Sequence, residues 1–165
     1  MPIIPPGILK NIKGAKEFFE RTGEKIHEML IGWEIERNKR IICENEKFIA
    51  LCPFVSRTPY EMRIFPKKTS SNFGDIQDED LMPLAEILNR VLRKLYIVLD
   101  NPDYTFFIHS SPIKKDNLDL YDFYHWHIEI MPRFSIAAGM ELGTNVFVNT
   151  VDPDEAAKLL REARI

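Results

Sequence analysis

The sequence predicts an α+β fold: a single domain, residues 1–165, in which an antiparallel sheet of about five strands packs with helices. Two observations predict this class. Apolar residues recur at helical spacing in the first 37 residues, in a long segment that ends near residue 99, and again at the C-terminus. Between these segments lie short runs with the period-two alternation of strands that bury one face.

Composition and charge limit the function classes. The formal net charge of −3 argues against a general nucleic-acid or anionic-membrane surface, since such a surface needs a basic excess. It leaves room for a phosphate pocket, which needs only one or two local cations. The two cysteines, Cys43 and Cys52, lack the spacing of a zinc knuckle and are too few for a disulfide scaffold. With no signal-peptide pattern and no apolar run of ~20 residues, a cytoplasmic protein is expected.

Two helices are expected first. The apolar stripe of the first is Ile8, Ile12, Ala15 and Phe19. Gly23 is placed to end that helix, because glycine adopts the left-handed conformation of a helix C-terminus without strain. The second helix is predicted over residues 24–37, with His27 exposed and an inward face formed by Ile26, Leu30 and Trp33.

Three strands of an antiparallel meander should follow. Residues 40–44 and 47–52 flank a turn at Asn45-Glu46, and residues 60–65 alternate cleanly. In the third strand Met62 and Ile64 lie on one face, opposite Arg63 and Phe65.

The second half should contain a long helix, two paired strands and a final helix. The long helix, with an acidic cap at Asp78 or Asp80, runs to Asn101-Pro102. The paired strands are 104–109 and 123–131, joined by a polar loop over 110–121. A Gly-containing loop over 137–144, a short strand over 146–148 and a helix near Pro153 complete the chain.

Strand 123–131 carries the residues most suited to chemistry. One face presents an apolar row, Tyr124, Trp126, Ile128 and Ile130. The other presents His125, His127 and Glu129, with neighbours about 6.5–7 Å apart along the backbone. Since the apolar row already accounts for burial, packing does not explain the polar row. A hairpin to strand 104–109 would bring His109 near His125.

The polar row has several possible uses. Alternate histidines can converge on zinc or iron. A histidine can attack phosphorus while its neighbours hold its tautomer. The row can also bind a ligand without chemistry, or be only a solvated polar face. Arg133, Lys67 and Lys68 are candidates for phosphate, and Gly139 and Glu141 for a sugar hydroxyl, although charges at strand ends are often simply solvated.

The segment His125-Trp-His-Ile-Glu resembles the histidine triad signature, with Glu129 in the third position. Four further stretches carry the resemblance: Glu44-Asn-Glu-Lys-Phe-Ile-Ala-Leu-Cys-Pro-Phe, Phe65-Pro-Lys-Lys, the continuation to Ile130-Met-Pro-Arg, and Ala138-Gly-Met-Glu-Leu-Gly-Thr. Together they resemble the C-terminal half of galactose-1-phosphate uridylyltransferase. The resemblance implies a histidine-triad-like fold and a transferase of galactose metabolism.

By this resemblance His109, His125 and His127 match histidines that hold a structural zinc or iron, and Glu141 matches a glutamate that contacts hexose phosphate. Asn11 falls near the position where some members carry a fourth ligand, a glutamate. The His-Pro-His segment that takes up the uridylyl group in the family does not occur. We therefore expect the second half alone, acting as a homodimer or with a separate chain that supplies the first half.

Three functions stay open at this point. The domain binds sugar phosphate or nucleotide sugar, through Glu141, Gly139, Arg133 and Lys67, and needs a partner for the nucleophile. In a variant, His127 is itself the nucleophile and Glu129 orients it. The third reading is a non-catalytic binding or structural module that kept the fold.

Overall fold

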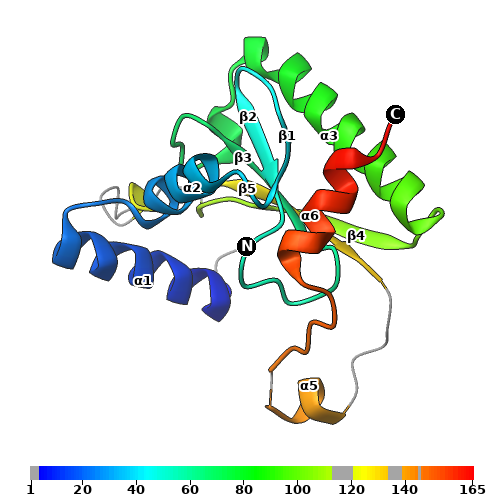
Figure 1. Ribbon diagram of the computed structural model, residues 1–165. Helices are drawn as coiled ribbons and strands as arrows, with labels where there is room; N and C mark the ends of the chain where they lie inside the picture. The colour runs from blue at the N-terminus through cyan, green and yellow to red at the C-terminus, as the bar shows by residue number, and fades with distance from the viewer. Residues whose placement is uncertain (1–3, 113–120, 134–138, 145) are drawn as a thin grey trace.

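The computed structural model describes residues 4–112, 121–133, 139–144 and 146–165 (Figure 1). Its strands are β1 (Ile41–Glu44), β2 (Phe48–Leu51), β3 (Met62–Pro66), β4 (Tyr104–His109) and β5 (His127–Pro132). Its helices are α1 (Pro6–Thr22), α2 (Ile26–Arg37), α3 (Asp78–Leu99), α5 (Gly139–Thr144) and α6 (Pro153–Glu162), with a 3-10 turn η1 (Phe73–Asp75). Part of the predicted loop 110–121, residues 113–120, and part of 137–144, residues 137–138, lie outside the described residues.

The five strands form one sheet in the order β1-β2-β3-β5-β4, and all neighbours are antiparallel. This confirms the predicted α+β class, the three-strand meander and the pairing of β4 with β5. The last strand in sequence lies between β3 and β4. As a result Arg63 of β3 and Phe107 of β4 are both register partners of Glu129.

Helices cover both faces of the sheet. Figure 1 shows α1 and α2 at the left of the view, and α3 at the upper right with α6 beside it. The larger core lies under α3 and α6, where Trp126, Ile128 and Ile130 pack with Met62 and Ile64. A smaller cluster joins Ile31 of α2 to β1, β2 and β3 on the other face. Within the described residues no helix is both long and apolar enough to cross a membrane.

The ends of several helices were predicted from sequence. α1 ends at Gly23, whose φ of 74° is left-handed, and α6 begins after Asp152, whose side chain accepts a hydrogen bond from the Asp154 amide. The long helix was predicted correctly, although its N-cap is Gln77 rather than an aspartate. The predicted strand 146–148 is wrong: these residues have no regular structure.

The inward face of α2 was also predicted wrongly. Leu30 and Trp33 are 45% and 52% exposed, whereas Ile31 and Glu34 are buried. The orientation follows from an ion pair at the helix end, because Arg40 contacts Glu34 at 2.8 Å and both side chains are largely shielded from solvent. Burying Ile31 and this pair turns Leu30 and Trp33 outward.

Strand β5 is shorter than predicted, beginning at His127 rather than Phe123. The preceding residues form a turn and an irregular segment, in which the Trp126 amide donates to the Ser70 carbonyl. The alternation rule holds only inside a strand, so the predicted apolar row is broken. Tyr124 packs with Ile12 and Tyr121 next to α1, on the opposite side from Trp126.

Candidate functional site

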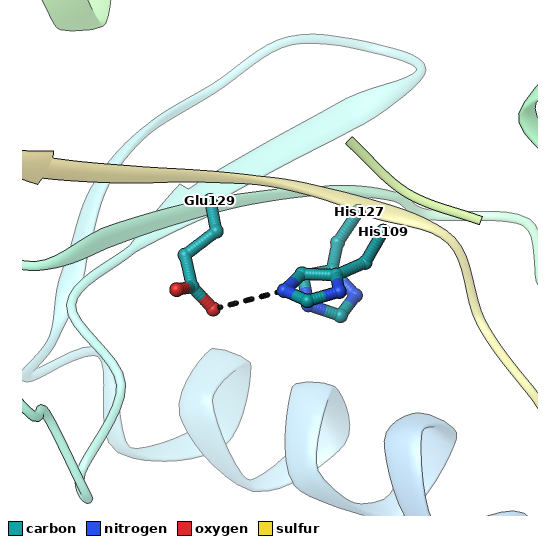
Figure 2. A group of neighbouring side chains, drawn as sticks. All are labelled: His109, His127 and Glu129. Atoms are coloured by element: carbon teal, nitrogen blue, oxygen red, sulfur yellow. Dashed lines mark ion pairs between the residues drawn. The ribbon is translucent and has the colours of Figure 1, made fainter. Parts of the chain in front are cut away.

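Three polar side chains of β4 and β5 converge on the α1–α2 side of the sheet. His127 and Glu129 are two residues apart on β5 and so share a face, and His109 is the register partner of His127. Their ligand atoms all lie within 4.8 Å of one another. Figure 2 shows the three side chains pointing away from the strands toward the N-terminal helices, with His109 Nε2 3.5 Å from Glu129 Oε2. We call these residues the His-His-Glu group.

His125 does not join this group. Its Nε2 lies 2.9 Å from the Pro66 carbonyl, which can only accept, so Nε2 carries the proton. Its Nδ1, which lies 3.2 Å from the Ser70 carbonyl oxygen, then accepts from the Ser70 amide at 3.3 Å. Burial lowers the pKa of His125, which favours this neutral form. Both ring nitrogens are therefore used in tying the segment before β5 to the loop after β3.

His127 is neutral with a defined tautomer. Its Nδ1 lies 3.1 Å from the carbonyl oxygen of His125, so Nδ1 donates and the lone pair is on Nε2. Burial lowers the pKa of His127 to about 2. The carbonyl of His125 thus holds this imidazole, a role that the sequence prediction had given to Glu129.

Glu129 contacts two arginines that were not predicted as site residues. Arg57 forms an ion pair with Oε1, and Arg63 Nε lies 3.3 Å from Oε2. The contact with Arg57 is an ion pair without an aligned hydrogen bond. The sequence placed Arg63 on the same face of β3 as Phe65. Its position beside Glu129, however, depends on β3 pairing with β5, which local spacing does not reveal.

His27 also belongs to this region, contrary to the prediction of an exposed side chain. Its ring centroid lies 6.0 Å from that of His125 and 6.3 Å from that of His127. Burial lowers its pKa to about 4. The spacing of His27, Ile31 and Glu34 at i, i+4 and i+7 was the signal that could have found this buried face.

One cavity is lined by the His-His-Glu group, and a second cavity shares Arg57 with it. The larger, about 1300 Å³, lies between α1, α2 and the sheet, and its lining includes His27, His109, His127 and Glu129. The smaller, about 320 Å³, is lined by Arg133 and Glu141, two predicted substrate residues, and by Phe107, Phe147 and Met131. Arg57 lines both cavities, so it stands between them.

The other predicted substrate residues lie elsewhere. Lys67 is 2.6 Å from Glu44, where it forms an ion pair at the end of the β1–β2 hairpin, and neither cavity includes it in its lining. Gly139 is the exposed first residue of α5, two positions before Glu141.

The predicted zinc or iron can be tested against these contacts. Histidine and carboxylate are suitable ligands for either metal, and Asn11 lines the larger cavity. However, both nitrogens of His125 are engaged, and a divalent ion would have to compete with Arg57 and Arg63 for Glu129. The residues as they stand do not fit a metal site, and no chemical step below passes through a metal.

A five-stranded antiparallel sheet with helices on both faces, and a His-x-Glu strand beside a strand that ends in histidine, gives the chain a histidine-triad-like fold. A structure of a Hit-like protein from Bartonella henselae shares the fold, with a TM-score of 0.54, 22% identity and coverage of 79% of this chain and 92% of that one.

Sequence comparison identifies the family more specifically than the fold does. The model of the galactose-1-phosphate uridyl transferase C-terminal domain matches residues 11–135, and the chain belongs to this family. It is 32% identical to ADP-glucose phosphorylase of Arabidopsis thaliana over 100% of this chain and 45% of the relative. It is 31% identical to galactose-1-phosphate uridylyltransferase of Thermotoga maritima over 99% of this chain and 52% of the relative.

Solved structures agree with the sequence matches. The structure of an ADP-glucose phosphorylase from Arabidopsis thaliana with bound ADP-glucose superposes with a TM-score of 0.89 and 31% identity. The match covers 100% of this chain and 52% of the chain in that structure. The chain thus spans about half the length of the curated relatives it matches.

Proposed function

We propose that this chain is the sugar-phosphate-binding domain of a nucleotidyl-transfer enzyme and takes hexose phosphate or nucleotide sugar. One observation carries the proposal: Arg57, Arg133 and Glu141 line the same cavity of about 320 Å³. Guanidinium groups bind phosphate through charge-assisted hydrogen bonds, and a carboxylate accepts hydrogen bonds from sugar hydroxyls. The volume is within the range of small-molecule sites.

In this function the nucleophile comes from outside these 165 residues. The relatives are about twice as long as the matched region, and their names describe transferases or phosphorylases that act on hexose 1-phosphate or ADP-glucose. A region that corresponds to the rest of the relatives, in the same chain or in a separate chain, would complete the enzyme. The exposed apolar side chains of the edge strand β4, Tyr104, Phe106 and Ile108, offer a surface for either.

Substitution of Arg133 tests the proposed phosphate contact. We expect Arg133→Met to weaken binding of galactose 1-phosphate or glucose 1-phosphate by about tenfold or more, because a charge-assisted pair with phosphate is lost. Isothermal titration calorimetry on the full chain measures the change. Arg164→Met, an exposed arginine outside both cavities, is the matched control. Equal affinities in the two variants would contradict the assignment of the phosphate to this cavity.

A second candidate function makes His127 itself the nucleophile. The observation that favours it is the contact of Nδ1 with the His125 carbonyl, which leaves the lone pair on Nε2 of a side chain that lines the larger cavity. In this step Nε2 forms a bond to the α-phosphorus of a nucleotide sugar. The bond from that phosphorus to the bridging oxygen breaks, and hexose 1-phosphate leaves with the electron pair.

A labelling experiment separates the two functions. If His127 is the nucleophile, incubation with UDP-glucose or ADP-glucose labelled in the nucleotide should give an acid-labile nucleotidyl adduct, and His127→Ala should give none. His125→Asn is the control for disturbance of the same segment, and it should retain the adduct. Absence of label on the wild-type chain together with hexose phosphate binding would leave the partner-dependent function and reject the second one.

A further inference from the structure

Glu129, a candidate metal ligand, is paired with two arginines. The carboxylate is 2% exposed, so it needs a cationic partner. Arg57 and Arg63 approach its two oxygens from the loop before β3 and from β3 itself. Their side chains are 35% and 25% exposed, so each guanidinium is held at the edge of the larger cavity rather than in bulk solvent.

A second buried carboxylate fixes the two arginines. Glu61 has no exposed surface; its Oε1 accepts from Arg63 Nη2 at 2.7 Å and from Nε at 3.1 Å. Its Oε2 accepts from the Arg57 backbone amide at 2.6 Å and lies 3.6 Å from Arg57 Nε. Glu61 and Glu129 therefore share the same two arginines. Each arginine is fixed from two sides.

The charges in this network are balanced before any ion is added. Two carboxylates face two guanidiniums, and burial keeps His109 and His127 in their neutral forms by lowering the pKa of each. A divalent cation at the His-His-Glu group would add two charges beside the arginines. It would bind only after displacing at least one of them from Glu129.

We propose that Arg57 and Arg63 supply at Glu129 the positive charge that a metal ion would otherwise supply. The protein thereby holds His109, His127 and Glu129 together without an ion. Glu61 is the positioning residue that keeps both arginines in place. This inference does not depend on which sugar phosphate or nucleotide the domain takes.

Zinc titration of the full chain tests the proposal, with a chromophoric chelator as competitor. We expect the wild type to bind Zn²⁺ with a dissociation constant of roughly 10 µM or weaker, because two neutral imidazoles alone form a poor site. The double variant Arg57→Met and Arg63→Met frees Glu129 and should bind one equivalent at least about tenfold more tightly. Addition of His127→Ala to the double variant should abolish the gain.

The control variant removes two positive charges that lie away from Glu129. Arg37→Met with Arg93→Met takes two exposed arginines from helices α2 and α3 and should leave zinc affinity unchanged. If the double variant does not fold by circular dichroism, the single variant Arg57→Met, which changes the more exposed arginine, should still show a gain of a few-fold. One tightly bound zinc in the wild type, or no gain in any folded variant, would overturn the proposal.

Discussion

Replacement of Glu61 by alanine should lower the free energy of unfolding by about 3–5 kcal/mol, the cost typical of removing one member of a buried ion pair. The reason is that Glu61 has no exposed surface and satisfies Arg57 and Arg63 together. Its loss leaves Glu129 as the remaining ionic partner of both guanidiniums within the described residues. Urea denaturation of the purified chain measures the change.

Two controls separate charge from shape in this experiment. Glu61→Gln keeps the volume and one hydrogen-bond acceptor, so it should cost less than the alanine variant. Glu86→Ala removes an exposed carboxylate from α3 and should change stability by less than about 0.5 kcal/mol. If Glu61→Ala were as stable as Glu86→Ala, the four-residue network of Glu61, Arg57, Arg63 and Glu129 would not contribute as described.

Acidification should destabilise the protein strongly between pH 7 and pH 5. Burial lowers the pKa of His127 to about 2 and that of His27 to about 4, so both are neutral in the folded chain across this range. In the unfolded chain each takes up a proton as pH falls below about 6.5. The unfolded state binds more protons, and stability falls as pH decreases. The expected loss is about 2 kcal/mol for each of the two histidines.

The measurement is the free energy of unfolding at pH 7, 6 and 5 for wild type and for His127→Gln. Because the glutamine cannot take up a proton, the variant should lose about 2 kcal/mol less than the wild type over this interval. His27→Gln should behave in the same way. Parallel pH curves for wild type and His127→Gln would show that His127 is not buried in its neutral form.

Much of the fold could be predicted because its signals are local. The change from helical to alternating periodicity located β1, β2 and β3, and Gly23 and Asp152 marked helix ends through backbone conformation and capping. The inward face of α2 could not be predicted in this way. Its orientation depends on the contact of Glu34 with Arg40 and on that of Arg40 with Asp154, a residue 114 positions away.

The candidate site was predicted in part. His109, His127 and Glu129 were all named, and the structure brings them together. His125 was placed with them on the assumption that strand alternation extended back to Phe123. Because β5 begins at His127, His125 instead bonds to the backbone of Ser70 and Pro66. The metal and substrate roles stay predictions for the experiments above.

The sequence by itself determined most of the helices and strands, and that the strand with His127 and Glu129 carries a polar face over an apolar back. It missed helix α5, in the predicted loop 137–144, and wrongly predicted a strand at 146–148. It also determined the family, because each matching stretch is a continuous run of residues that can be read without the fold. Only the tertiary structure decided what surrounds that polar face. Placing β5 between β3 and β4 brings Arg63 and His109 to opposite sides of Glu129, and α2 adds His27. Strand order and register arise from long-range pairing and burial, which residue spacing along one strand does not encode.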